Sequence, residues 1–107
     1  MSRPPSATVT AVIPAHNQRT RLESLLGDLA RQSLPLQEVL VVDNGSRDGS
    51  ADMARERGAR ILAMGSNTGF ARAVNRGIKE SRQRYVAVLN DDVRLDSGWL
   101  SRLVEKL

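Results

Sequence analysis

The chain has 107 residues, a formal net charge of +4 and 40% hydrophobic residues, which suits one small globular domain. It contains no cysteine and one histidine, which excludes a disulfide scaffold, a thiolate zinc site, a cysteine nucleophile and a histidine-rich metal site. No apolar run approaches the roughly 20 residues that span a bilayer, and the first residues lack a signal-peptide hydrophobic segment, so we expect a cytoplasmic protein.

The first part of the chain predicts an arm, a strand and a helix. Residues 1–7 contain Pro and Ser and are expected to form a flexible arm. Residues 9–13 are apolar and β-branched, which predicts a buried strand. Thr20 and Glu23 match a capping box, and Pro35 marks the exit from the helix that follows. Leu22, Leu25, Leu26 and Leu29 recur at helical spacing, and Arg21, Glu23, Ser24 and Asp28 mostly fall on other faces.

The middle of the chain repeats this alternation. Residues 38–42 form a second apolar run, followed by a helix that opens at Asp48 or Ser50 and closes near Gly58. Residues 60–64 predict a third strand.

The last part adds a third helix over residues 70–81 and a fourth strand over residues 85–89. A final helix is indicated by Trp99, Leu100, Leu103, Val104 and Leu107.

Short apolar strands that alternate with amphipathic helices predict an α/β fold with a parallel sheet and helices on both faces. Ligands of such sheets bind beyond the carboxyl ends of the strands, where the strand order reverses. The unusual polar residues of this chain directly follow the predicted strands. Side chains that can bind a ligand are therefore expected to gather at the carboxyl edge of the sheet. They are His16 and Asn17, then Asp43, then Asn67 and Gly69, and finally Asp91 and Asp92.

The ligand has to be bound without a phosphate-cradling glycine loop. Residues 14–18 follow the first strand without a glycine, so neither a dinucleotide fingerprint nor a P-loop is present. Asp91 and Asp92 offer oxygen ligands for Mg²⁺ or Mn²⁺, which can bridge a few carboxylates and a diphosphate. Asp43 is an acceptor placed for a donor on a ribose or a base.

These residues resemble the N-terminal half of family 2 glycosyltransferases, inverting enzymes with a Rossmann-like, A-type transferase fold. The resemblance covers about residues 8–107, and its motifs fall at predicted strand ends and helix starts. Residues 89–92, followed by Gly98-Trp99-Leu100, are most similar to the rhamnosyltransferase branch that acts in cell-surface polysaccharide synthesis. The four segments are residues 12–17 (VIPAHN), 41–50 (VVDNGSRDGS), 67–77 (NTGFARAVNRG) and 88–93 (VLNDDV).

The resemblance implies nucleotide-binding roles for residues near the first three strands. Asp43 matches the aspartate that accepts the imide N–H of uracil or thymine, and a turn Asp is the alternative. His16 matches a position beside the nucleobase, where its ring would stack, and a loop histidine without a role is the alternative. Pro14 and Ala15 would offer backbone contacts, and Gly69 would allow a close approach of the backbone.

It also implies roles after the fourth strand. Asp92 matches the last aspartate of the family's D-x-D motif, which binds the cation, and a turn preceding a helix is the alternative. Asp91, at the variable middle position, would contact the sugar or ribose. Asn90 stands where many members have Asp, so a metal site with two carboxylates is in question and Asn90 would bind the ribose.

The resemblance implies an inverting transfer from a UDP- or dTDP-linked sugar to a glycan or lipid-linked acceptor. The cation on Asp92 would neutralise the leaving diphosphate. No carboxylate in the chain matches the family's general base, which we expect beyond Leu107, so residues 8–107 are expected to be a donor-binding half truncated at its C-terminus. The alternative is a catalytically incomplete nucleotide-binding or interaction module.

Three partner expectations complete the analysis. The 16 basic residues are scattered rather than gathered in a stripe with aromatics, so we expect no nucleic-acid partner. The positive charge and a lipid-linked acceptor would place the parent protein at the inner face of the membrane, as a peripheral protein. Little of the chain is left to cover the apolar residues of the last helix, so we expect the isolated chain to self-associate.

Overall fold

The computed structural model describes residues 7–107, so the arm expected over residues 1–7 lies outside the described part except for Ala7, which begins the first strand. The alternation of strands and helices predicted from the sequence is confirmed. The elements are β1 (Ala7–Ala15), α1 (Arg19–Ala30), β2 (Leu36–Asp43), α2 (Ser50–Glu56), β3 (Arg60–Ala63), α3 (Phe70–Glu80), β4 (Tyr85–Val88) and α4 (Trp99–Glu105).

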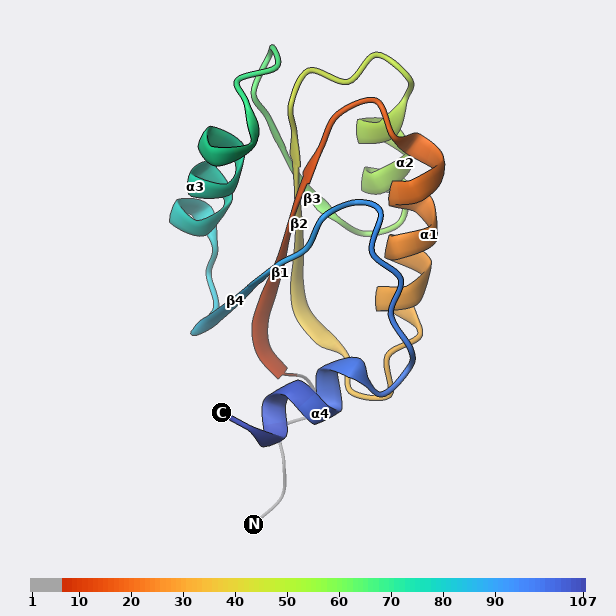
Figure 1. The fold of residues 1–107 in the computed structure, drawn as a ribbon, viewed down its shortest axis with the longest axis vertical. Helices are drawn as coiled ribbons and strands as arrows, with labels where there is room; N and C mark the ends of the chain where they lie inside the picture. The colour runs from red at the N-terminus through yellow and green to blue at the C-terminus, as the bar shows by residue number, and fades with distance from the viewer. Residues whose placement is uncertain (1–6) are drawn as a thin grey trace.

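The four strands form one parallel sheet in the order β3-β2-β1-β4. Val12 of β1 pairs with Leu40 of β2 on one side and with Val88 of β4 on the other. α1 and α2 cover one face of the sheet and α3 covers the other (Figure 1). The predicted architecture, helices on both faces included, is therefore confirmed.

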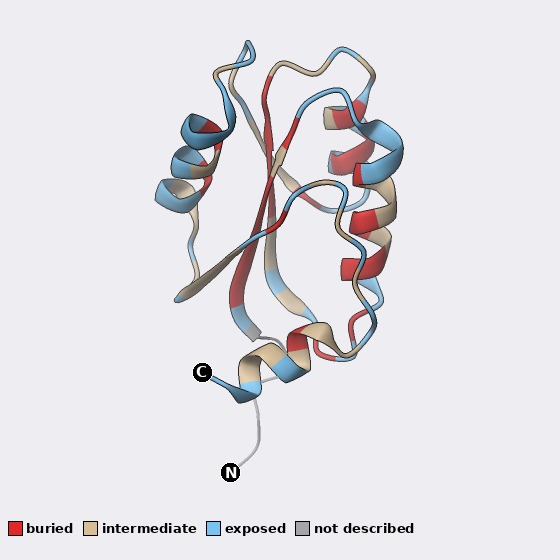
Figure 2. Ribbon diagram, viewed as in Figure 1, coloured by how far each residue is buried: buried red, intermediate tan, exposed pale blue. Residues whose placement is uncertain are grey.

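The core lies on both sides of β1, which explains why its sequence is apolar without alternation. Ala11 and Ile13 belong to the cluster that contains the buried leucines of α1, and Val12 packs with Val42 and Ala73 on the α3 side. Buried residues concentrate on the two central strands and on the inner faces of α1 and α2 (Figure 2).

The start of α1 differs from the prediction. The helix begins at Arg19, one residue before the Thr20 expected as its cap, and its N-cap residue Gln18 makes no side-chain capping bond. Asp48 supplies the missing acceptor from the next loop, because its Oδ2 accepts the backbone N–H of Arg19 at 3.0 Å. The capping box was therefore the wrong interpretation of Thr20 and Glu23.

The same carboxylate organises the start of α2, as the sequence predicted. Oδ1 of Asp48 accepts the backbone N–H of Ser50 at 3.1 Å and also the Ser50 hydroxyl. Burial raises the pKa of Asp48, but the hydrogen bonds from Ser50 and from the Arg19 backbone outweigh it and lower that pKa below its usual value. Asp48 thus joins the starts of two helices.

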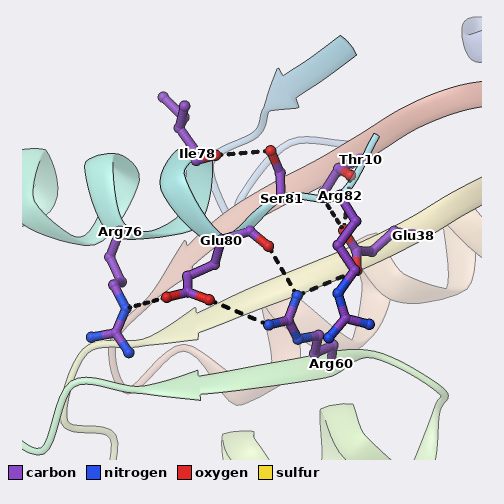
Figure 3. Close-up of polar contacts among 8 residues, drawn as sticks. All are labelled: Thr10, Glu38, Arg60, Arg76, Ile78, Glu80, Ser81 and Arg82. Atoms are coloured by element: carbon purple, nitrogen blue, oxygen red, sulfur yellow. Dashed lines mark hydrogen bonds and ion pairs between the residues drawn. The ribbon is translucent and has the colours of Figure 1, made fainter. Parts of the chain in front are cut away.

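A polar network joins α3 to the amino ends of the strands (Figure 3). Glu38 of β2 accepts hydrogen bonds from the Thr10 hydroxyl at 3.0 Å and from the Arg82 backbone at 3.2 Å. Arg60 of β3 donates to the backbone oxygen of Glu80 at 3.0 Å and pairs with the carboxylates of Glu80 and Glu38, each at 3.5 Å. This edge is therefore held by ion pairs and is opposite the carboxyl edge.

α4 packs at the amino end of the sheet, which corrects one expectation. Leu100 is fully buried with Val9 and Leu34, and Trp99 is partly buried against the same cluster. The chain therefore does bury part of the apolar face of its last helix. Leu107 remains 59% exposed.

Candidate functional site

A cavity of about 290 Å³ opens at the carboxyl edge of the sheet. The chain passes from β1 outward to β2 and β3 and then crosses to the opposite side of β1 to form β4, so the strand order reverses between β1 and β4. The cavity lies at this reversal, where ligands of parallel sheets bind. It is lined by Pro14, Ala15, His16, Asn44, Asn67, Phe70, Asn90, Asp91 and Asp92.

Six of the residues predicted from the sequence are thus brought together. Pro14, Ala15 and His16 come from the end of β1, and residues 90–92 come from the end of β4. The described residues that line the cavity do not include Asp43, the last residue of β2, or Gly69, the residue before α3.

The His16 ring is held by the neighbouring loop. Its Nδ1 lies 2.8 Å from the backbone oxygen of Asn44, and because a carbonyl oxygen only accepts, this nitrogen carries the proton. Nε2 is therefore the acceptor for the Asn17 side-chain amide at 3.4 Å. At the end of β1 the cavity is therefore lined by the exposed imidazole of His16, with its proton on Nδ1.

Asn17 orders this loop. Its Oδ1 accepts the backbone N–H of Arg47 at 2.7 Å, and its own backbone N–H donates to the Ser46 hydroxyl at 3.0 Å. It adopts a positive φ of 51°, a conformation that Asn tolerates better than most residues.

Asn44 joins three loops beneath the cavity and was not predicted. Its side chain is 5% exposed, and its Nδ2 donates to Asn67 Oδ1 at 3.0 Å and to the backbone oxygen of Gly69 at 3.1 Å. Its Oδ1 accepts the backbone N–H and the hydroxyl of Thr68 at 2.8 and 2.9 Å. Asn44 therefore fixes the loop between β3 and α3 to the end of β2.

Asp43 is buried beside the cavity at the end of β2, with 8% exposure. Its Oδ1 accepts the backbone N–H of Ser46 at 3.1 Å, which is the turn arrangement considered as an alternative to base binding. An ionised carboxylate has about four acceptor sites, so this bond leaves capacity for a ligand.

Gly69 precedes α3 with a φ of 90°, which side chains other than glycine rarely adopt. A Cβ built on it would meet nothing within 4 Å, so the space beside its backbone is open. The close approach of a ligand to this backbone, which the resemblance implies, stays a prediction.

Asp91 and Asp92 form the acidic side of the cavity. Burial raises the pKa of Asp91, the adjacent charge of Asp92 raises it further, and Arg21 of α1 lowers it. Two neighbouring carboxylates in a partly dehydrated place repel each other and favour a cation.

The residues fit a cation that takes most of its ligands from substrate phosphates and water and few from the protein. Within residues 7–107, no group of three or more His, Cys, Asp or Glu side chains gathers into a metal cluster. Mg²⁺ and similar ions are commonly held by one or two carboxylates together with substrate phosphates and water. Asp92, with Asp91 beside it, satisfies that smaller requirement.

Three residues of the cavity were missed by sequence reasoning as site residues. Asn44 sits in an Asp-Asn-Gly-Ser segment that was taken for turn chemistry, and Asn67 was noted only as polar. Phe70, the first residue of α3, is 57% exposed at the cavity. Its signal was an aromatic residue directly after the Asn-Thr-Gly segment in a chain with three aromatics.

Curated relatives are glycosyltransferases. The chain is 33% identical over 106 residues to "Glycosyltransferase AglE" of Haloferax volcanii, covering 92% of this chain and 35% of the relative. It is 31% identical over 102 residues to "Uncharacterized glycosyltransferase EpsJ" of Bacillus subtilis, covering 92% of this chain and 30% of the relative. The chain therefore spans about a third of the length of these relatives.

Solved structures share the fold. A mannosyltransferase of Pyrobaculum calidifontis, solved with GDP-Man and Mn²⁺, superposes with a TM-score of 0.85 at 23% identity and covers 94% of this chain and 32% of its own. S. aureus TarS, solved with UDP-GlcNAc, superposes with a TM-score of 0.83 at 22% identity and covers 91% and 30%. Both structures share the fold of this chain.

Two further findings bear on the class of protein. Among the described helices, none is long and apolar enough to cross a membrane. The family model for Glycosyl transferase family 2 matches residues 10–107, which is nearly the whole chain. The chain belongs to glycosyl transferase family 2.

Proposed function

We propose that residues 8–107 form the donor-binding half of an inverting glycosyltransferase that takes a UDP- or dTDP-linked sugar together with Mg²⁺ or Mn²⁺. The observation that carries the proposal is the cavity at the strand-order reversal, where Asp91 and Asp92 lie opposite Pro14, Ala15 and His16. Fold neighbours solved with GDP-Man and Mn²⁺ or with UDP-GlcNAc support a nucleotide-sugar ligand.

The diphosphate lies at the acidic side of the cavity in this proposal. The chain has no glycine-rich phosphate loop after β1, so the negative charge of the diphosphate needs a cation, and Asp92 is its protein ligand. When bound, the cation supplies electrostatic neutralisation of the charge that develops on the leaving diphosphate. Asn90 and Asp91 contact the ribose or the sugar.

The nucleobase lies at the side formed by β1 and β2. His16, whose Nδ1–H is held by the Asn44 carbonyl, presents a ring of fixed tautomer on which a base can stack. Asp43 accepts the imide N–H of uracil or thymine with the acceptor capacity that Ser46 leaves, and Pro14, Ala15 and Gly69 give backbone contacts.

In the reaction, an oxygen of the acceptor attacks the anomeric carbon of the donor sugar. The bond from that carbon to the β-phosphate oxygen breaks, the nucleoside diphosphate leaves with the electron pair, and the configuration inverts. A general base takes the hydroxyl proton. We assign no residue of this chain to that role and expect the base beyond Leu107.

The proposed acceptor is a glycan or a lipid-linked glycan of cell-surface polysaccharide synthesis, used by a peripheral protein at the cytoplasmic face of the membrane. The segment Leu89-Asn90-Asp91-Asp92 places the protein nearest to the rhamnosyltransferase branch in this proposal. Because the general base is expected beyond Leu107, incubation of this chain with donor and acceptor should give no transfer, and transfer by the chain alone would contradict that expectation.

Titration calorimetry with UDP and dTDP, in Mn²⁺ or in EDTA, tests the proposal. We expect binding in Mn²⁺ and its loss in EDTA and in Asp92→Ala. Asp52→Ala is the matched control, because Asp52 is an exposed aspartate of α2 that pairs with Arg55. Equal affinities of Asp92→Ala and the native chain would contradict the assignment of the cation to Asp92.

A further inference from the structure

The chain takes an unusual course after the acidic side of the cavity. From the end of β4 it does not enter a helix at the carboxyl edge but runs back beside α1 and reaches α4 at the amino end of the sheet (Figure 1). Asp91 and Asp92 lie at the start of this returning segment, which comprises residues 90–98. What holds the segment therefore bears on where the two carboxylates lie.

The strongest attachment is a buried carboxylate that the sequence placed on the polar side of α1. Asp28 is 5% exposed. Its Oδ2 accepts the Arg94 Nε–H at 2.8 Å and the Leu95 backbone N–H at 2.9 Å, and its Oδ1 accepts Arg94 Nη2 at 3.1 Å. Arg94 is thus bound side-on through two nitrogens, the geometry of a strong and directional pair.

Gln32, one helical turn further along the chain, adds a second attachment. Its Nε2 donates to the backbone oxygen of Asp96 at 2.6 Å and its Oε1 accepts the Leu100 N–H at 2.9 Å. The backbone N–H of Ser33 also donates to the oxygen of Ser97 at 2.8 Å. The far end of the returning segment is therefore fixed to the loop that follows α1.

The near end of the segment is fixed to the sheet. The backbone N–H of Leu89 donates to the oxygen of Val12 at 2.9 Å, which continues the pairing of β4 with β1. Between Leu89 and Arg94 the backbone N–H of Val93 donates to the Asn90 oxygen at the long distance of 3.3 Å. Asp91 and Asp92 thus lie on a short span whose two ends are fixed by different parts of the fold.

We propose that Asp28 and Arg94 form a latch that positions the Asp91–Asp92 span for cation-dependent nucleotide binding. This inference rests on the proposed function. Asp28 and Arg94 are positioning residues, because the described contacts join them to each other and to the segment rather than to the cavity. Loss of the latch would let the Asp91–Asp92 span move. Mutation of residues that orient metal ligands commonly lowers metal affinity by about 10- to 100-fold.

Asp28 has two arginine partners, which offers a matched pair of variants. Arg94 and Arg31 both donate to its carboxylate and are similarly exposed, at 66% and 68%. Arg94 comes from the returning segment, whereas Arg31 is the C-cap residue of α1, three positions after Asp28. Arg94→Gln and Arg31→Gln therefore remove the same charge from the same partner, but only the first detaches the segment from the helix.

Calorimetry with UDP and Mn²⁺ is the first measurement. We expect the affinity to fall about tenfold in Arg94→Gln, to stay within about twofold in Arg31→Gln, and to recover in part in Arg94→Lys, which restores a donor and the charge. The midpoint of thermal unfolding is recorded for each variant. A loss of thermal stability in Arg94→Gln with unchanged affinity would reduce the latch to a structural contact and overturn the inference.

Amide hydrogen exchange separates this inference from the proposed function. We expect faster exchange at Val93 and Leu95 in Arg94→Gln than in Arg31→Gln, whether or not nucleotide is present. If the native chain binds no UDP with Mn²⁺, the proposed function fails, and faster exchange would still support the ordering of the span. Unchanged exchange at both amides in Arg94→Gln would overturn the latch itself.

Discussion

Gly77 of α3 faces Val12 of β1 so closely that a Cβ on the glycine would overlap Val12 Cγ1 and would lie 3.0 Å from Val42 Cγ2. The helix can therefore approach the two central strands only because position 77 has no side chain. The contact keeps α3 against the face of the sheet behind the cavity.

Gly77→Ala is expected to destabilise the chain by about 1–3 kcal/mol, because the methyl group would force α3 away from the sheet. Urea unfolding followed by Trp99 fluorescence measures the change. Gly27→Ala is the matched control: Gly27 is also helical, and its Cβ would meet the flexible end of Arg31 at 3.2 Å. That variant should be neutral or gain up to about 1 kcal/mol, and equal losses in both would contradict the close approach.

Asn44→Asp is expected to cost about 3 kcal/mol, because a carboxylate cannot donate to Asn67 Oδ1 and to the Gly69 oxygen in a buried place. The free energy of unfolding in urea gives the cost. Asn75→Asp, an exposed change on α3, should stay within about 0.5 kcal/mol. If Asn44→Asp is as stable as Asn75→Asp, the side chain does not fix the loop between β3 and α3 to the end of β2.

The contribution of Asp28 to the free energy of unfolding depends on pH. The side-chain bond from Arg94 is the largest cause that lowers the pKa of Asp28 from 3.8 to about 2, although burial opposes it. A lowered pKa means that the folded state binds fewer protons, so the stabilisation is present above pH about 4 and is lost as the pH falls toward 2. Its size is about 2 kcal/mol.

Asp28→Asn should therefore have a lower free energy of unfolding than the native chain near pH 7. This difference should become smaller as the pH falls from about 5 to about 2. Urea unfolding at several pH values measures the difference. Asp52→Asn, an exposed change with a side-chain exposure of 83%, should show a small difference at every pH. If the difference in free energy of unfolding between Asp28→Asn and the native chain does not change with pH, Asp28 is not a charged carboxylate paired with Arg94.

Asp43→Ala should weaken the binding of uridine and thymidine diphosphates more than that of cytidine diphosphate, because only the first two offer an imide N–H. Loss of one hydrogen bond to a charged group costs roughly 1.5–3 kcal/mol. Calorimetry with the three nucleotides compares the losses. Equal losses for all bases would exclude Asp43 from the base site and leave it the turn role that its bond to Ser46 already gives.

Self-association remains a prediction after the structure. β4 lies at the edge of the sheet, and a groove of about 330 Å³ runs between it and α4. Val88 on this strand is 41% exposed. We expect a dimer by sedimentation at several concentrations and a shift to monomer in Val88→Lys, since lysine on an edge strand opposes pairing. Ile78→Lys, at an exposed apolar position of α3 with 45% exposure, should keep the dimer. A monomer at all concentrations would contradict the prediction.

The parts of the structure that the sequence predicted are those whose signal is local. The strands showed as short apolar runs, and the residues that follow β1 and β4 met in one cavity because parallel strands end at one edge. Leu22, Leu25, Leu26 and Leu29 were buried as their spacing indicated.

The parts that the sequence did not predict depend on partners far along the chain. Asp28 was assigned to the polar side of α1, and it is buried because Arg94, 66 positions away, supplies the opposite charge. Asn44 looked like turn chemistry because its partners lie in the loop after β3. The cap of α1 came from Asp48 rather than from Thr20, since this distant carboxylate accepts the backbone N–H of Arg19.

The strand order also sets when the cavity comes into existence during folding. Val12 of β1 pairs with Leu40 of β2, which is 28 positions away, but it pairs with Val88 of β4 across 76 positions. Closing a long loop has a higher entropic cost and delays the contact. If β4 docks last, the ends of β1 and β2 would be in place before Asp91 and Asp92 reach the cavity. Metal-dependent ligand binding would thus report on the last step of folding, and stopped-flow refolding with ligand can time that step.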